Sequence, residues 1–267
     1  MVIVKTFKNI EYGNIHGRPL LLDLHLPAEG NGPFPLVFYV HGGGWHSGNK
    51  DDATNLEAFI KAGYAMSAMD YRLSGEAKFP AQIEDVKSAL RWLWEHAAEL
   101  GLDSRRFVAW GHSAGAHLVA LLAATEKSGK FETVHQTEKS SGLLGVAAVA
   151  APIDLLLASK GLYNSIGALL GGDPSELAQR AKEAGPLTYL TAEAPPFLIV
   201  HGDADQAVPL ENSTLLHSAL QRLGVPTRLV IQEGVGHGNH NHPGMVKELL
   251  RFFDSLVRQS GAESLYP

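Results

Sequence analysis

Continuous runs of apolar residues recur along this chain, and segments with a helical pattern separate them. A strand covered on both faces is apolar throughout, as Pro35–Val40 is, whereas a half-exposed strand alternates, as Leu20–Leu26 does. Further continuous runs predict strands at Tyr64–Met69, Phe107–Trp110, Leu144–Val149, Phe197–Val200 and Thr227–Ile231. The chain is therefore constrained to a sheet whose central strands are buried on both faces.

Apolar residues at steps of three and four mark helices between these runs. The longest stripe extends from Ile83 to Leu100, with Pro80 before it and Gly101 after it. Two more stripes cover Leu215–Leu223 and Val246–Val257. Buried strands that alternate with amphipathic helices predict an α/β fold, in which a mostly parallel central sheet carries helices on both faces.

No repeat, low-complexity tract or linker divides the sequence, so we expect a single domain over residues 1–267. The segment Ile153–Pro195 breaks the alternation and is rich in Leu and Gly, with a helix expected around Pro174–Ala184. Its length fits a small cap or lid over a pocket, and a simple crossover connection is the alternative. We expect most of its larger apolar residues to fill the core rather than line a pocket; these are Leu155, Leu156, Leu157, Ile166 and Leu169.

Composition excludes several classes of function. The formal net charge is −6 and no long basic run is present, so nucleic acid is not an expected partner. The longest apolar stretch, Leu143–Ala158, contains Pro152 and Asp154, so we expect no membrane span. The N-terminus turns polar at Lys5, so we expect no signal peptide in this sequence and a cytoplasmic protein, with a secreted protein as the alternative. The chain has no cysteine, so a covalent mechanism must use an oxygen or nitrogen nucleophile.

The segment Gly111–Gly115 matches the pattern G-x-S-x-G. So short a pattern also occurs by chance, but here the predicted strand Phe107–Trp110 precedes it and the helical segment Ala116–Ala124 follows it. Strand, tight turn and helix are the context of a nucleophile elbow, where glycines avoid clashes around a strained serine. A plain helix cap is the alternative. We predict that Ser113 is a nucleophile.

Three consecutive glycines follow the predicted strand that ends at Val40, within the segment His41–Trp45. Glycines allow the backbone to approach a ligand and to aim successive N–H groups at one point. Such donors stabilise the oxyanion that forms when an ester carbonyl is attacked. We assign this role to Gly43 and Gly44, together with Ala114 at the start of the helix after the serine.

A flexible turn is the alternative reading of these glycines, but it would not explain the aromatic residues His41 and Trp45 on their flanks. We expect Trp45 to contact the substrate, and the same role is expected of His112, the neighbour of the predicted nucleophile.

A serine hydroxyl needs a general base. Among 13 histidines, His237 lies in the loop after the last predicted strand, Thr227–Ile231, and should meet Ser113 at the same edge of the sheet. His240 and His242 are its competitors. These three histidines lack helical spacing and a nearby acidic ligand run, so we expect no metal site.

Two aspartates compete to orient this base. Asp203 and Asp205 both follow the predicted strand Phe197–Val200. The chain order serine, acid, histidine fits either of them. Asp203 is close enough to the strand end to satisfy turn amides instead, and Asp205 lies further out, so spacing alone does not choose.

Together these segments resemble the α/β hydrolases, in the branch of hormone-sensitive-lipase-like and bacterial carbohydrate (BD-FAE-like) esterases, from about Leu20 to Phe253. In that family the pattern H-G-x-x-D-x-x-V-P has its catalytic acid at the fifth position, which is Asp205 here. His112 departs from the acidic residue common in hormone-sensitive-lipase relatives, and Ala116 stands where a further glycine is common. The segments that carry the resemblance are His41–Trp45, Asp70–Ser74, Phe79–Ala81, Gly111–Gly115, His201–Pro209 and His237-Gly238.

The resemblance implies the α/β-hydrolase fold and a serine carboxylic ester hydrolase that needs no cofactor. The expected substrates are small esters with a short acyl chain, chiefly acetyl esters, and they include esters of carbohydrates. The expected mechanism proceeds through an acyl-enzyme on Ser113. An arylformamidase that uses the same residues is one alternative, and a non-catalytic ligand-binding protein on this scaffold is another. The sequence carries no signal of oligomeric state.

Overall fold

The computed structural model describes residues 4–132, 142–157, 160–238 and 242–262. Within these ranges an 8-stranded sheet has the order β1-β2-β4-β3-β5-β6-β7-β8. The strand β2 pairs antiparallel with β1 and with β4, and all other neighbouring pairs are parallel, which confirms the predicted sheet. The strands are β1 (Val4–Ile15), β2 (Arg18–Pro27), β3 (Phe34–Val40), β4 (Ala65–Met69), β5 (Leu102–His112), β6 (Leu143–Val149), β7 (Phe197–Gly202) and β8 (Thr227–Gln232).

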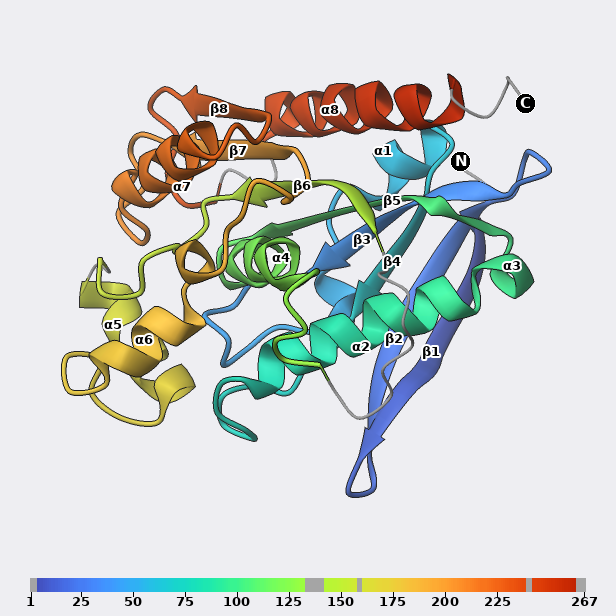
Figure 1. Ribbon diagram of the computed structural model, residues 1–267. Coiled ribbons are helices and arrows are strands. Elements are labelled where there is room, and N and C mark those ends of the chain that lie inside the picture. Colours follow the sequence, from blue (N-terminus) through green and yellow to red (C-terminus); the bar gives the residue numbers. More distant parts are fainter. Residues whose placement is uncertain (1–3, 133–141, 158–159, 239–241, 263–267) are drawn as a thin grey trace.

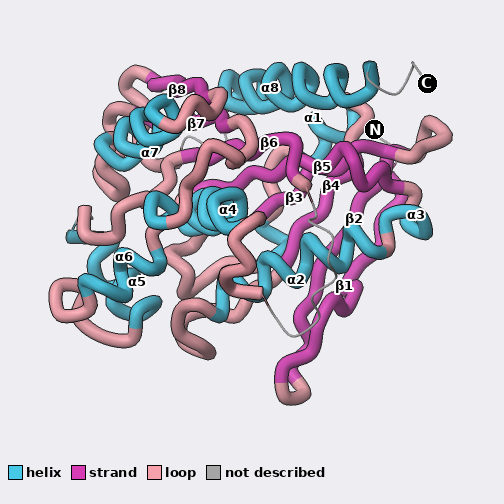
Figure 2. Tube along the Cα trace, in the orientation of Figure 1, coloured by secondary structure: helices cyan, strands magenta, loops and turns pink. Residues whose placement is uncertain are grey.

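Helices cover both faces of this sheet (Figure 1, Figure 2). On one face, α1 and α8 pack Phe59 and Phe253 against the sheet, together with Tyr64 before β4. The other face carries a larger apolar cluster, to which α2, α4 and α7 contribute. The helices are α1 (Leu56–Lys61), α2 (Ala81–Glu95), α3 (Ala97–Leu100), α4 (Ala114–Thr125), α5 (Lys160–Leu170), α6 (Ala178–Ala184), α7 (Glu211–Arg222) and α8 (Pro243–Ala262), with short 3-10 turns η1 (Lys50–Asp52) and η2 (Pro186–Thr188).

The helix predicted from Ile83 to Leu100 is divided in two by His96. At this residue both the backbone N–H and the ring Nδ1 lie within hydrogen-bond distance of the Trp92 carbonyl, and the His96 ring stacks on the Trp92 ring. The side chain thus caps α2, and α3 continues the chain with its own apolar contact at Ala97. An apolar stripe continues across such a break, so periodicity alone misses it.

Two elements of the structure were not predicted from the sequence patterns. The edge strand β1 is largely exposed, with only Tyr12 buried, so it shows no apolar run. The helix α5 lies inside the segment 153–195, for which the sequence predicted a helix only around Pro174–Ala184. An exposed edge strand leaves a weak sequence signal. The helix α5 does bury an apolar face, formed by Leu162, Ile166, Leu169 and Leu170, and this helical spacing was not predicted.

The segment 153–195, which the sequence predicts to be a cap or a crossover connection and which is labelled the cap below, contains α5, α6 and η2, and lies on the side toward which the parallel strands point (Figure 1). Asn212 of α7 ties its first residues to the domain, because its side-chain oxygen accepts the backbone N–H groups of Ile153 and Asp154 at 2.8 and 2.9 Å. Ile166 and Leu169 are fully buried, as predicted, whereas Leu156 is 51% exposed. The described part of the cap therefore packs into the main apolar cluster.

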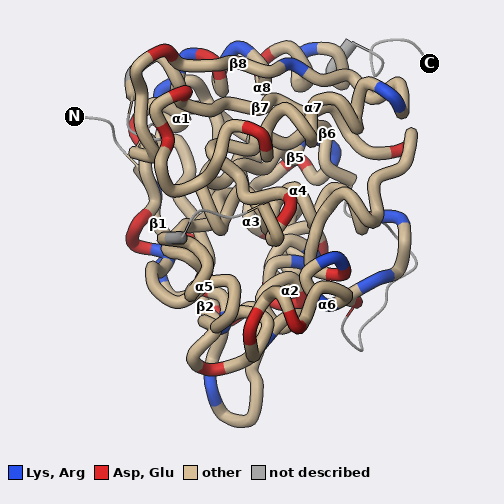
Figure 3. The backbone as a smooth tube through the Cα atoms, turned by 90° about the vertical axis from the view of Figure 1, so that its left-hand side faces the viewer, with Lys and Arg blue, Asp and Glu red and all other residues tan. Residues whose placement is uncertain are grey.

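Charged residues of both signs are interspersed along the described backbone (Figure 3). A membrane-spanning helix would need greater length and apolarity than any helix in the described ranges has.

Candidate active site

Ser113 lies in a tight turn between β5 and α4, with φ 56° and ψ −122°. This strained conformation requires small neighbours. A Cβ at Gly115 would lie 2.0 Å from the carbonyl oxygen of Val40, and one at Gly111 would lie 2.4 Å from the backbone of Gly115. The backbone N–H of Ser113 donates to Val149 of the next strand at 2.9 Å. The two glycines of the motif are therefore steric requirements of the elbow.

Three distant segments bring a hydroxyl, an imidazole and a carboxylate into a line. The Nε2 atom of His237 is 3.0 Å from the Oγ atom of Ser113, and its Nδ1 atom is 2.7 Å from the Oδ2 atom of Asp205. The carboxylate is fully buried, while the His237 side chain is 29% exposed. This arrangement matches the serine, base and orienting acid of a hydrolase triad.

The two competing aspartates have different partners. Asp203 accepts the backbone N–H of Gly234, which is the turn-amide role. Asp205 instead reaches His237, while its Oδ1 atom accepts the backbone N–H groups of Ala207 and Val208 at 2.8 and 2.9 Å. The structure thus places the aspartate that the family pattern selects, and not its neighbour, beside the imidazole.

A second histidine, His201, supports the carboxylate of Asp205. Its Nε2 atom is 3.3 Å from Oδ2 of Asp205 and 3.0 Å from the carbonyl oxygen of Val208, and its Nδ1 atom accepts the hydroxyl of Ser213. Burial raises the pKa of Asp205, but hydrogen bonds from His201 and His237 outweigh it and hold that pKa well below its ordinary value. The carboxylate is therefore ionised at neutral pH. His201 is the first residue of the H-G-x-x-D-x-x-V-P pattern, which by itself predicts no role for this histidine.

Of the two other histidines proposed as the base, the structure describes one. His240 lies outside the described residues. His242 is exposed, and its Nδ1 atom accepts the backbone N–H of Gly244. Across the described ranges, no group of three or more histidine, cysteine, aspartate or glutamate residues could hold a metal ion.

The glycine loop lies beside the nucleophile. Gly43 and Gly44 have positive φ angles of 103° and 57°, and a Cβ at Gly43 would lie 2.2 Å from the carbonyl oxygen of Ser47. The Gly43 carbonyl accepts the backbone N–H groups of His46 and Ser47, and these hydrogen bonds hold the loop in a tight turn. Within the described residues, the backbone N–H groups of Gly43, Gly44 and Ala114 have no hydrogen-bond partner, so they remain available to an oxyanion.

Tyr71 packs against the first residues of this loop. Its hydroxyl donates to the carbonyl of His41 at 3.2 Å, and its ring stacks on the His41 ring with centroids 4.2 Å apart. Burial raises the pKa of Tyr71 and lowers that of His41, so both side chains are neutral at pH 7. Tyr71 belongs to the segment Asp70–Ser74, which carries part of the family resemblance, and its contacts show that it packs against the glycine loop.

The structure argues against the expected contact between Trp45 and substrate. Trp45 is fully buried, and its indole N–H donates to Nδ1 of His117 at 3.3 Å. The Nε2 atom of His117 in turn donates to the carbonyl of Ala184 in α6, at 2.8 Å. Trp45 therefore links the glycine loop to the core and cap, because an apolar ring of this size is stabilised by burial.

A cavity of about 840 Å³ opens at Ser113 and His237, whereas the buried Asp205 does not line it. Ser113, His237 and His112 line it together with the glycine loop. The cap contributes Leu162 and Ser165 of α5. The remaining wall is polar for the most part and is formed by Tyr39, His46, Ser47, Gly48, Asp51, Asp52, Ala53 and Thr54.

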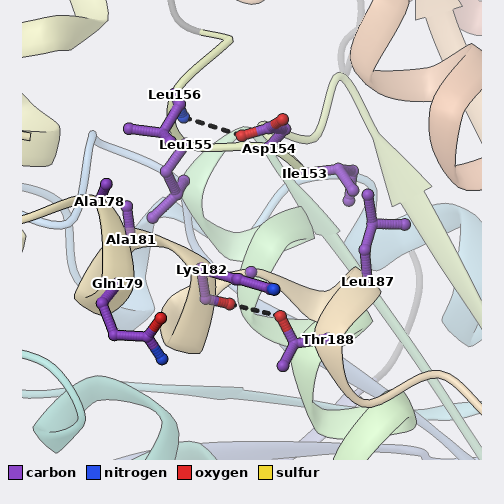
Figure 4. A pocket seen from close by; sticks show the side chains of 11 residues that line it. Ile153, Asp154, Leu155, Leu156, Ala178, Gln179, Ala181, Lys182, Leu187 and Thr188 are labelled. Atoms are coloured by element: carbon purple, nitrogen blue, oxygen red, sulfur yellow. Dashed lines mark hydrogen bonds between the residues drawn. The ribbon is translucent and has the colours of Figure 1, made fainter. Parts of the chain in front are cut away.

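A second cavity of about 480 Å³ lies within the cap, and the residues that line it include no triad member. Leu155 and Leu156 face α6 across it, near Ala178 and Ala181 (Figure 4). Two local hydrogen bonds shape its rim: Leu156 N–H donates to the side chain of Asp154, and the Thr188 hydroxyl to the carbonyl of Lys182.

Comparison with known proteins places this geometry in a family. A family model described as BD-FAE matches residues 22–220, a range that includes Ser113 and Asp205. The chain is 30% identical over 227 residues to a probable isoprenylcysteine alpha-carbonyl methylesterase of Arabidopsis thaliana, which covers 81% of this chain and 48% of that protein. The chain thus spans about half the length of this relative.

Solved structures agree over nearly the whole chain. A truncated carbohydrate esterase from gut microbiota has a TM-score of 0.86 at 26% identity and covers 95% of this chain and 96% of its own. Esterase 2 of Thermogutta terrifontis, phosphoramylated by tabun, has a TM-score of 0.76 at 29% identity, with 97% of this chain and 95% of its own covered. With its mostly parallel sheet, its serine elbow and its Asp–His–Ser line, the chain belongs to the BD-FAE family of α/β-hydrolase serine esterases.

Proposed function

We propose that this protein hydrolyses carboxylic esters through an acyl-enzyme formed on Ser113. The observation that carries the proposal is the hydrogen-bonded line from Asp205 through His237 to Ser113 at the wall of a cavity. The likeness to esterases adds support, since one of them is described as phosphoramylated by an organophosphate.

In the first step, His237 takes the proton of Ser113 as the hydroxyl oxygen attacks the ester carbonyl. Asp205 holds the imidazole tautomer and stabilises the imidazolium. His237 then returns the proton to the departing alcohol, which leaves the acyl group on the serine. Water repeats the sequence, with His237 as base and then acid, and releases the carboxylic acid.

The oxyanion of each tetrahedral intermediate is stabilised by the backbone N–H groups of Gly43, Gly44 and Ala114. Each such donor contributes about 3 kcal/mol in the transition state of comparable hydrolases. Ala114 is also the first residue of α4, so the helix dipole favours negative charge beside Ser113.

The preferred substrate we propose is an acetyl ester of a neutral, polyhydroxylated alcohol such as a sugar. The cavity wall carries hydroxyl and carboxylate groups, among them Thr54, Ser165 and Asp52, that can exchange hydrogen bonds with sugar hydroxyls. The carboxylate of Asp52 disfavours an anionic alcohol, whereas that of Asp51 is paired with Lys8 and Lys50. The similarity to a carbohydrate esterase structure points the same way.

Hydrolysis of p-nitrophenyl acetate by the wild type and by Ser113→Ala tests the activity. We expect the variant to lose about 10⁶-fold in kcat and to stay unlabelled by a fluorophosphonate probe. A variant that kept half of the wild-type rate would refute the acyl-enzyme and favour a non-catalytic scaffold.

A second assay compares p-nitrophenyl esters of increasing acyl length, acetylated xylo-oligosaccharides and N-formylkynurenine. We expect kcat/KM to fall with acyl length and to be higher for the acetylated sugar than for an alkyl acetate. A preference for the long acyl chains would contradict the short-acyl assignment, and a preference for N-formylkynurenine would identify an arylformamidase.

A further inference from the structure

Two consecutive residues of the elbow both bond to the same histidine. Ser113 contacts the ring of His237 through Nε2, at 3.0 Å. His112 contacts its backbone: the Nε2 atom of His112 is 2.7 Å from the carbonyl oxygen of His237, so this nitrogen carries the proton and donates. The two imidazole rings lie side by side, with centroids 4.8 Å apart.

The backbone around His237 has little other support. Val235 accepts the N–H of Ala204, and this is the last such anchor before the histidine. From residue 236 to residue 238, the backbone makes no hydrogen bond to another backbone group of the described chain. The neighbours Gly236 and Gly238 also place little restriction on the backbone. Without a further anchor, this stretch of backbone would be held only through the hydrogen bonds of the His237 ring to Asp205 and Ser113.

His112 itself is held rigidly. It is the last residue of β5 and only 7% exposed, and it is paired with Val149 of β6 in the parallel sheet. A donor on this residue therefore moves with the elbow that carries Ser113. A hydrogen bond from it to His237 fixes the distance between nucleophile and base.

We propose that His112 is a positioning residue that locks the backbone of His237 to the elbow through its Nε2–H group. The bond is made to a carbonyl rather than to the ring, so it persists whether the imidazole of His237 is neutral or protonated. It therefore acts in both halves of the reaction without taking part in proton transfer. This proposal rests on the proposed function. It assigns His112 a role other than the substrate contact predicted from the sequence.

The role requires a donor at the position of Nε2, which separates two amide variants. In His112→Gln the side-chain amide nitrogen reaches that position, whereas in His112→Asn it stops near the position of Nδ1. A third variant, His112→Leu, keeps the bulk and removes the donor. A misplacement of about 1 Å in the base costs about 10²-fold in rate. We expect kcat to fall by about ten- to a hundredfold in His112→Asn and His112→Leu, with KM little changed.

The test measures kcat, KM, fluorophosphonate labelling rate and thermal unfolding for the three variants, with Ser113→Ala as the reference. We expect His112→Gln to stay within about threefold of the wild-type kcat, and the labelling rate to fall in parallel with kcat. Labelling involves no sugar, so it would not respond to a lost substrate contact.

Three results would overturn the proposal. Wild-type kcat in His112→Asn shows that the donor is not needed. A Gln variant as slow as the Asn variant shows that the amide position does not matter. A rise in KM alone, with normal labelling, assigns His112 to substrate binding. An active Ser113→Ala variant instead refutes the proposed function, which keeps the two failures apart.

Discussion

The buried His117 should make the protein acid-sensitive in a way that one variant can isolate. This side chain is fully buried, accepts the indole N–H of Trp45 and donates to the carbonyl of Ala184. Protonation of His117 at Nδ1 would place a charge in the apolar core. The new N–H group would also face the indole N–H of Trp45, so this hydrogen bond would be lost. Burial accordingly lowers the pKa of His117 from 6.5 to about 4.

The sign of the effect follows from this lowered pKa. Between pH 6.5 and pH 4 the unfolded chain binds a proton at His117 that the folded chain does not, so the free energy of unfolding falls as the pH is lowered. From pH 7 to pH 5 the loss from this one group is about 2 kcal/mol. The stabilisation is complete above pH 6.5, and below pH 4 the loss from this group levels off.

Urea denaturation of the wild type and of His117→Gln at pH 7 and pH 5 measures this loss. Glutamine keeps a donor and an acceptor but does not titrate, and all other histidines contribute equally to both proteins. The free energy of unfolding of the wild type should fall by about 2 kcal/mol more than that of the variant. Equal losses in the two proteins would refute the assignment of a neutral, buried His117.

Three further substitutions test the site and its supports. Asp205→Asn replaces an acceptor facing His237 with a donor, and kcat on p-nitrophenyl acetate should fall by about 10⁴-fold; a loss below tenfold would contradict the orienting role. Gly115→Ala puts a Cβ 2.0 Å from a carbonyl oxygen and should destabilise the fold by at least about 3 kcal/mol in thermal unfolding, whereas Gly75→Ala, with no atom within 4 Å, should have little effect. Asn212→Ala removes the acceptor of one buried and one part-buried N–H group and should lower the free energy of unfolding in urea by about 2 kcal/mol; an unchanged value would show that the cap is anchored elsewhere.

Local sequence patterns were sufficient to predict most of the scaffold. Burial on both faces makes a strand continuously apolar, so Pro35–Val40 and Phe197–Val200 were recognisable as central strands. The glycines around Ser113 were equally recognisable from the sequence. A side chain at either position would clash with backbone that lies a few residues away or in the adjoining strand. The exposed strand β1 and the break at His96 left no such pattern.

The choice among similar side chains depended on contacts that no local pattern contains. Spacing did not choose between Asp203 and Asp205, and the family pattern was needed to select the second. Trp45 sits next to the glycine loop in sequence, yet its side chain turns into the core to reach His117. Each of these outcomes is a matter of side-chain direction, which residue spacing does not report.

The sequence by itself determined that a parallel sheet would carry a strained serine at its carboxyl edge, because burial and steric fit act on neighbouring residues. Only the tertiary structure decided which partners meet there. The imidazole of His237 lies 124 positions from Ser113 and 32 from Asp205, and His112 reaches its backbone across 125 positions. Hydrogen bonds between such distant residues exist only once the sheet has brought its strand ends together, so their geometry is a property of the folded chain.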